Sequence, residues 1–220
     1  MIKIENVEVV GWEAAIRGMR NPLNSWEKSD SGYHNNPIYD EKHPMFIHDN
    51  PIFVVGPNDK DLMKRLRNAG TDHRKFMRMI TVYVDITAPM YWWSEFDTYK
   101  IGTVANSCSK MHTIHKTEIS EDLFSFDHVE LCEVGKEYIK ELEKLRVKFN
   151  ETKDKKYWYA LIQLIPASFN QKRTVMLNYE VLANMYKSRK NHKLDEWHTL
   201  CDWTKTLPYS ELITGEFDKQ

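Results

Sequence analysis

The sequence lacks the features that mark several common classes of protein. Its 220 residues include only three cysteines, Cys108, Cys132 and Cys201, and an odd number at unrelated spacings argues against a disulfide framework. No stretch approaches the ~18 apolar residues of a membrane span, and the N-terminus shows no basic region followed by an apolar run. We therefore expect a cytoplasmic protein without a membrane partner.

An excess of positive charge is also missing. Lysine and arginine total 31 against 32 acidic residues, for a formal net charge of −1, whereas nucleic-acid-binding domains usually carry a basic excess. The eight glycines are scattered, and no G-x-G-x-x-G or G-x-x-x-x-G-K pattern occurs. We expect no nucleic-acid partner and no glycine-rich phosphate loop, and we expect one domain over residues 1–220, a length sufficient for a sizeable core.

The periodicity of apolar residues predicts a mixed α+β chain. Alternation predicts strands over residues 2–11 and 76–89. Helical spacing and end signals predict helices over 11–22, 58–70, 90–99, 136–149, 174–190 and 194–208. The helix over 58–70 is expected to begin with an Asn or Asp cap. Residues 157–166 form a short buried segment, and residues 23–51 and 112–130 are expected to be irregular.

The helix expected over residues 174–190 carries polar groups that a purely structural helix does not require. Asn178 and Arg189 are eleven residues apart, about three turns at ~3.6 residues per turn, so they are predicted to share one face. Leu182 and Met185 lie between them on that face. The helix is either a solvated edge of the fold or one wall of a ligand site.

Three further patterns have a plain structural explanation. Cys108, His112 and His115 have a spacing that zinc accepts, but a structural zinc site needs four ligands, and we expect no metal. His192 and Glu196 are one helical turn apart, as in an ordinary surface pair. The aromatic helix over 90–99 is typical of a core or of a subunit interface.

The segment TYKIGTVANSCSKM, residues 98–111, combines lysines with small hydroxylated residues. Backbone N–H groups and side-chain donors of this kind suit a loop that wraps an anion. Taken alone, the composition is a weak indication of a phosphate site.

Taken in order along the chain, these pieces resemble the flavin-dependent thymidylate synthases. In that family a helix ending in glycine precedes a histidine, a strand ending in Ala-Pro and an aromatic helix. Here Gly70, His73 and the pair Ala88-Pro89 occupy these places, and YWWSEF supplies the aromatic helix. The family signature R-H-R-x-x-S-x-N-E-x-S-x-R then falls, without a gap, on Thr98, Tyr99, Lys100, Thr103, Ala105, Asn106, Cys108 and Lys110.

The signature is altered in this chain. The first arginine and the histidine of the family are Thr98 and Tyr99, and the later cations are lysines, which offer a point charge where arginine offers a bidentate fork. A register shifted by one residue instead places Asn106 on the family asparagine and Ser109 on the family serine. Both registers stay open.

The second half of the chain follows the family more closely. The family positions with matching spacing are Pro166, Asn178, Asn184 and Arg189, followed in a slightly altered register by His192, Glu196 and Trp197. Before the proline, where the family has a phosphate-binding arginine, this chain has Ile162 and Gln163. The resemblance covers roughly residues 5–210 and is that of a divergent member, of phage or bacterial type.

The resemblance implies a mostly antiparallel sheet flanked by helices, and a homotetramer whose sites are shared between subunits. It implies FAD as cofactor, NADPH and methylenetetrahydrofolate as co-substrates, and transfer of a one-carbon unit to a pyrimidine deoxynucleotide, either dUMP or a related base. The alternative is a non-catalytic relative that kept flavin and nucleotide binding.

The resemblance also assigns expected roles to individual residues. The catalytic cations are Lys100, Lys110 and Arg189. The cofactor-binding residues are His73, Asn106, Asn178, Asn184 and His192. The substrate-binding residues are Thr103, Cys108, Ser109, Lys110 and Arg189.

Overall fold

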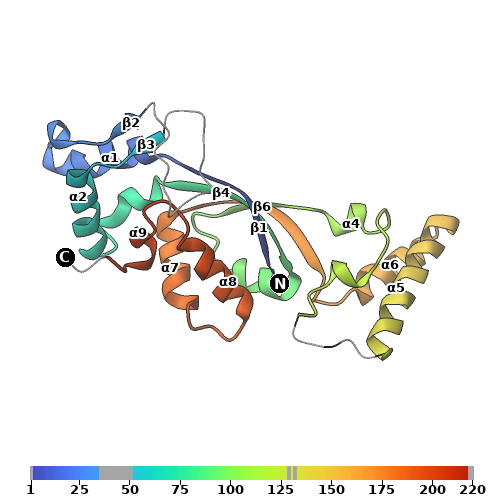
Figure 1. Cartoon of the computed structure of the whole chain (residues 1–220). Coiled ribbons are helices and arrows are strands. Elements are labelled where there is room, and N and C mark those ends of the chain that lie inside the picture. The colour runs from blue at the N-terminus through green and yellow to red at the C-terminus, as the bar shows by residue number, and fades with distance from the viewer. Residues whose placement is uncertain (1, 35–51, 128–129, 131–132, 218–220) are drawn as a thin grey trace. The chain divides into compact units, whose positions relative to one another are not determined.

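The computed structural model describes residues 2–34, 52–127, 130 and 133–217 of the chain (Figure 1). Residues 35–51 of the predicted long loop, and Cys132, lie outside the described residues. The chain divides into two compact units. The first comprises Met1–Asn6, Val84–Lys100 and Ala105–Val175, and the second comprises Val7–Tyr83, Ile101–Val104 and Met176–Gln220.

The strands belong to two sheets. Four strands form one antiparallel sheet in the order β1-β4-β6-β5, with the bounds Lys3–Val10, Thr81–Pro89, Asn170–Asn178 and Val104–Ser107. The short strands β2 (Gly32–His34) and β3 (Ile52–Val54) pair antiparallel, with Tyr33 opposite Phe53. With helices flanking the larger sheet, the predicted α+β class is confirmed.

The second unit holds five α-helices among its described residues. They are α1 (Trp12–Arg20), α2 (Pro57–Asn68), α7 (Tyr179–Arg189), α8 (Asp195–Thr204) and α9 (Glu211–Thr214), with the 3₁₀ helices η1 (Asn21–Leu23), η2 (Trp26–Lys28) and η4 (Arg74–Arg78). Helix α7 packs against α8, α9 and η4, and its apolar residues Leu182 and Met185 are fully buried. That stripe is therefore part of the core of the second unit.

The first unit holds α3 (Met90–Phe96), α4 (Lys110–Thr113), α5 (Glu133–Thr152) and α6 (Lys155–Leu164), with the 3₁₀ helix η5 (Glu121–Leu123). Trp92, Trp93 and Phe96 of α3 are buried within the chain and contact one another edge-on or tilted at about 5 Å. The aromatic helix is therefore core. Helices α5 and α6 pack together (Figure 1) around Leu142 and Leu161.

Several predicted elements differ from the observed ones. The helix predicted over 174–190 begins only at Tyr179, because residues 170–178 alternate between buried and exposed positions and form strand β6. Residues 74–78 are the 3₁₀ helix η4 and not the start of the strand predicted over 76–89. Residues 157–164 of the segment predicted as buried at 157–166 belong to helix α6, and Tyr159 is 54% exposed. The stretch predicted to be irregular at 112–130 includes the end of α4 and η5.

Helix α2 begins with Pro57, a residue suited to the first helical turn, and its N-cap is Gly56 and not the expected Asn58 or Asp59. The carboxylate of Asp30, from a separate segment, accepts hydrogen bonds from the backbone N–H groups of Asn58 and Asp59 at 2.8 and 3.1 Å. A side chain from a distant segment thus caps the start of α2, a role that was expected of Asn58 or Asp59.

Across the described part of the chain, none of the helices has the length and apolar character that a membrane crossing requires.

Candidate functional site

Asn178 is held at the junction between β6 and α7. It is the N-cap of α7, with extended backbone angles, and its Oδ1 accepts a hydrogen bond from the backbone N–H of Val181 at 3.0 Å. The amide nitrogen lies against Gly102: a Cβ added there would be 2.9 Å from Nδ2 of Asn178. Asn178 therefore precedes the helix, and the prediction that it shares a helical face with Arg189 is wrong.

Asn184, on α7, is fixed by an arginine of η4. Nη2 of Arg74 donates to Oδ1 of Asn184 at 2.9 Å, and Nε of Arg74 donates to Oε1 of Glu180 at 3.3 Å. Glu180 is buried and also binds Arg78, which raises the pKa of that guanidinium. Neither arginine was predicted from the sequence. Their i,i+4 spacing next to the predicted His73, which is exposed, was the available signal.

The two asparagines share one chemical property. The side-chain oxygens of Asn178 and Asn184 each accept one hydrogen bond from the protein, which fixes the orientation of the amide and leaves its NH₂ group as a donor beside one remaining lone pair on the oxygen. Arg74 adds guanidinium donors beside Asn184. These NH₂ and guanidinium donors suit a ligand rich in acceptors, such as ring carbonyls and phosphates.

The end of α7 and the start of α8 bring together three residues predicted for the site. The guanidinium of Arg189 lies over the ring of Trp197, with 4.7 Å to the centroid, a favourable cation–π distance. The ring of His192 meets Trp197 edge-on at 6.2 Å, and Nδ1 of His192 accepts the backbone N–H of Leu194 at 3.2 Å. Glu196, predicted as half of an exposed pair, is buried. That prediction is wrong.

In the first unit, Lys110 and Arg173 form a pair of cations. Burial lowers the pKa of Lys110, and the charge of Arg173 lowers it further, while the ammonium group lies 5.7 Å from the ring centroid of Phe169. Arg173 already has Asp97 as an ionic partner at 2.7 Å, and an anion bound beside Lys110 would favour the charged form of that lysine. The pair is therefore suited to a phosphate or carboxylate.

Arg173 is the functional candidate that the sequence analysis missed in this unit. It lies on β6, stacked over Trp93 at 4.2 Å, and its Nη1 donates to Asp97 at 2.7 Å. Its Nε donates to Oε1 of Gln171 at 3.0 Å, and Nε2 of Gln171 donates to the carbonyl oxygen of Cys108 at 2.7 Å. The signature segment and the arginine are thus joined through one buried glutamine.

The rest of the 98–111 segment is a strand and a helical turn and not a single wrapping loop. Strand β5 carries Asn106, which is exposed, as are Lys100 and Cys108. Ser109 precedes α4, and its carbonyl oxygen accepts the N–H of Thr113 at 3.1 Å. Thr103 belongs to the second unit, whereas the residues from 105 onward belong to the first. None of the predicted signature residues from 98 to 110 lines either the hollow at Glu13 and Trp26 or the hollow at Phe149 and Trp158.

His112 and His115, considered above as zinc ligands with Cys108, line a hollow beside Phe149 and Trp158. The ring of His115 packs edge-on against Phe149 at 5.3 Å. No group of three or more histidine, cysteine or acidic residues suited to a metal ion occurs within residues 2–34, 52–127, 130 and 133–217.

Two crystal structures of Thymidylate Synthase X (ThyX) from Helicobacter pylori, both with FAD and dUMP, are similar to this chain over nearly their full length. The first superposes with a TM-score of 0.70, and the match covers 98% of this chain and 98% of the solved chain. The second has a TM-score of 0.66, and the match covers 96% of this chain and 99% of the solved chain. The fold is that of the flavin-dependent thymidylate synthases. Both are only 17% identical to this chain, so the similarity establishes the thymidylate synthase fold. No protein-family model and no curated protein matches the sequence.

Proposed function

We propose that this protein is a flavoprotein that transfers a one-carbon unit to a pyrimidine deoxynucleotide, either dUMP or a related base. The observation that carries the proposal is the full-length similarity of its fold to a thymidylate synthase structure that holds FAD and dUMP. The proposal extends a similarity of fold to a function, and the donor-rich environment of Asn178, Asn184 and Arg189 supports that step.

The residues of the second unit fit FAD by their chemistry. The side-chain oxygens of Asn178 and Asn184 accept hydrogen bonds from the protein, which sets the direction of their NH₂ groups, and the tight approach of Gly102 to the Asn178 amide leaves no room for a side chain at position 102. A flavin presents ring carbonyls, and its pyrophosphate presents anionic oxygens, so both ends accept hydrogen bonds. We propose that Asn178, Asn184, His73 and His192 hold the cofactor, with Arg74 orienting Asn184.

Lys110 and Arg173 fit the anionic end of a nucleotide. We propose that they bind its phosphate, with Cys108, Ser109 and Asn106 lining the substrate and Lys100 adding positive charge. Thr103 and Arg189, which belong to the second unit, are proposed as substrate-binding residues from the family resemblance alone. Cations held near a base polarise its carbonyl groups and stabilise negative charge that develops during reaction. The bound flavin would supply hydride chemistry, with NADPH and methylenetetrahydrofolate as co-substrates.

A non-catalytic relative is the second candidate. Thr98, at the place of the family's first arginine, is exposed, and its hydroxyl donates to the carbonyl oxygen of Glu95 at 2.7 Å at the end of α3. In this role it terminates a helix and contributes no charge. We expect dUMP methylation to be weak, because loss of one oxyanion-stabilising donor alone can remove ~2.7–4 kcal/mol of transition-state stabilisation.

Complementation of a thymidine-requiring strain tests activity. We expect poor growth without thymidine from this chain, and a preparation that nevertheless carries flavin. Robust growth would show an ordinary thymidylate synthase. No growth, together with the absence of flavin, would overturn the proposed function.

We further propose that the chain is a single functional domain that assembles as a homotetramer with shared sites. Light scattering of the purified protein tests the assembly. A particle of four times 26.2 kDa is expected. A monomer at working concentration would remove the shared-site arrangement.

A further inference from the structure

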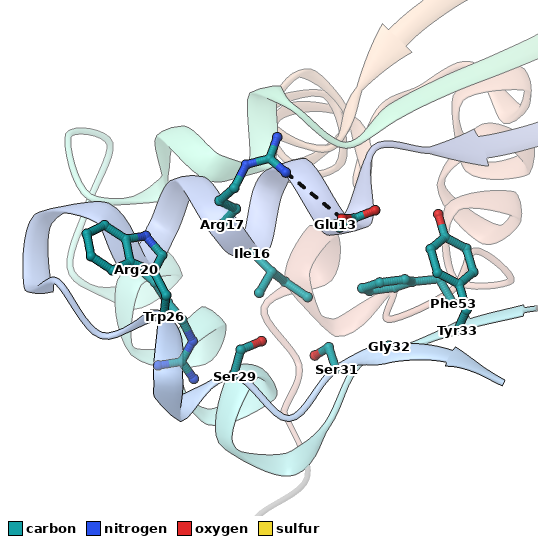
Figure 2. A pocket seen from close by; sticks show the side chains of 10 residues that line it. All are labelled: Glu13, Ile16, Arg17, Arg20, Trp26, Ser29, Ser31, Gly32, Tyr33 and Phe53. Carbon is teal, nitrogen blue, oxygen red and sulfur yellow. Dashed lines mark ion pairs between the residues drawn. The ribbon is translucent and has the colours of Figure 1, made fainter.

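A hollow of about 390 Å³ lies in the second unit between α1, η2 and the β2–β3 pair (Figure 2). None of the residues assigned above to flavin or nucleotide lines it. Its volume falls within the range of ~300–1,000 Å³ typical of small-molecule sites. It is a separate candidate, and the inference drawn from it does not depend on the proposed function.

The floor of the hollow is rigid because its polar groups are bonded to one another. Nε of Arg20 donates to Asp59 at 2.6 Å, and its Nη2 donates to the carbonyl oxygen of Lys28 at 3.0 Å. The hydroxyls of Ser29 and Ser31 donate to the other carboxylate oxygen of Asp59, at 2.7 and 2.6 Å. Because these groups are used internally, the floor has little capacity to read the hydrogen-bonding edge of a ligand.

The walls are aromatic and open to solvent. Figure 2 shows Trp26 at one end and Phe53 with Tyr33 at the other, with Ile16 between them. Trp26 is 50% exposed and Tyr33 is 63% exposed. The indole N–H of Trp26 donates to Oδ1 of Asn21 at 2.8 Å, which fixes the ring, and Tyr33 is held edge-on to Phe53 at 5.1 Å. Fixed, exposed aromatic rings around a hollow are suited to stacking a flat ligand.

One weakly held cation stands at the rim. Nη1 of Arg17 is 4.0 Å from Glu13, and both side chains are largely exposed, at 65% and 63%. Such a pair contributes little to stability, so Arg17 can turn to an anion at small cost. Glu13 also lines the hollow, so an anionic group on a stacked ligand would bind Arg17 by displacing the Glu13 carboxylate from this weak pair.

From the aromatic walls, the internally bonded floor and Arg17, we propose that this hollow binds a nucleoside monophosphate through its base and phosphate. The base stacks against Trp26, and the phosphate meets Arg17. Because the floor does not read base edges, adenine and guanine bind alike, and both bind more tightly than uracil, since a purine has the larger stacking surface.

The test is a titration of the full chain with adenosine 5′-monophosphate, in which binding is measured by isothermal titration calorimetry and by tryptophan fluorescence. We expect saturable binding with fluorescence quenching that Trp26→Phe largely removes. Trp26→Ala should weaken binding roughly 5- to 150-fold, the range for loss of one base–aromatic stack. Arg17→Met should weaken binding about fivefold and leave the binding of uncharged adenosine unchanged. Circular dichroism establishes that each variant is folded.

A matched control is available on α2. Arg65 pairs with Asp61 at the same i,i+4 spacing and with nearly the same exposure, 68% and 63%, but does not line the hollow. Arg65→Met should leave binding unchanged. Because FAD contains an adenylate group, Asn178→Ala provides the second control, and it too should leave binding unchanged.

Three results would overturn the proposal. The first is no saturable binding by folded protein at millimolar nucleotide. The second is an equal effect of Arg17→Met and Arg65→Met. The third is loss of binding in Asn178→Ala, which would place the nucleotide in the proposed flavin site.

Discussion

Arg74 and Asn184 are 110 residues apart in the chain, yet Nη2 of Arg74 donates directly to Oδ1 of Asn184 at 2.9 Å. The same guanidinium is anchored to the buried carboxylate of Glu180. The bond occupies the amide oxygen of Asn184 and thereby sets the direction of its NH₂ group. A 3₁₀ helix thus orients a side chain of α7 that the family resemblance assigns to the cofactor.

Replacement of Arg74 tests whether this residue orients Asn184 for flavin binding or only stabilises the fold. Arg74→Met removes the bond to Asn184 and is expected to lower flavin affinity about tenfold, the equivalent of one charge-assisted hydrogen bond of ~1.5 kcal/mol. Flavin titration of the apoprotein measures it. Arg78→Met is the control, because Arg78 also binds Glu180 but is not the donor to Asn184. Equal losses of affinity in the two variants would refute the positioning role.

Gly102 should not tolerate a side chain. Its φ is +78°, and an added Cβ would lie 2.9 Å from Nδ2 of Asn178 and 3.0 Å from Val181. Gly102→Ala should therefore cost roughly 1–2 kcal/mol from backbone strain and should also weaken flavin binding by displacing Asn178.

Gly70→Ala supplies the matched comparison for Gly102→Ala in urea unfolding and in flavin titration. Gly70 has a φ of +111°, but nothing lies within 4 Å of an added Cβ. The Gly70→Ala variant should be less stable than the parent and should bind flavin with unchanged affinity. A loss of affinity as large as that of Gly102→Ala would count against the contact with Asn178.

Lys110 should lower the stability of the unliganded fold and strengthen dUMP binding. Burial, and then the charge of Arg173, lowers the pKa of Lys110, so its charged form disfavours the folded state when no anion is bound. Lys110→Met should weaken dUMP binding about tenfold and raise stability slightly. That gain should be present below the folded-state pKa and vanish as pH rises past the ordinary value of 10.5.

Calorimetric dUMP titration and urea unfolding measure these two effects. Lys116→Met, which removes an exposed lysine outside the signature segment, is the control and should change neither quantity. If Lys110→Met destabilises the protein and binds dUMP normally, Lys110 is a structural residue.

Asp85 should make the first unit sensitive to acid. Hydrogen bonds from Thr174, then Asn6, then Lys172 lower its pKa from 3.8 to about 2. Because the folded-state pKa is depressed, the stabilisation is present above pH 3.8 and is lost as pH falls toward 2. Urea unfolding of Asp85→Asn should show a lower midpoint than the parent at pH 7 and converge with it near pH 2. Parallel pH profiles would contradict this.

The long periodic elements were predictable from sequence, and the junctions between elements were not. Strand β1 and helices α2, α5 and α8 follow local periodicity, so their existence was predicted correctly. The boundary at Asn178 was misplaced because RTVMLN has apolar residues compatible with either period, and only pairing within the sheet selects the strand. The N-cap of α2 was missed because Asp30 comes from a separate segment.

The candidate site shows the same limit. Asn184 and Arg189 were found through family spacing, but Arg74 and Arg173 were not, because neither occupies a motif position. Their importance arises from contacts with Asn184 and Gln171 that form only in the folded chain. Sequence spacing can identify a side chain on one element, whereas the partners that orient it come from distant segments.

The central claim, that this chain binds FAD together with a pyrimidine deoxynucleotide, is tested most directly by the visible absorption spectrum of the purified protein during titration with dUMP. The account predicts a yellow protein whose flavin spectrum shifts saturably on adding dUMP, with the flavin lost in the Asn178→Ala and Asn184→Ala double variant. A folded protein that takes up no flavin when supplied with excess FAD, and whose double variant behaves like the parent, would contradict it.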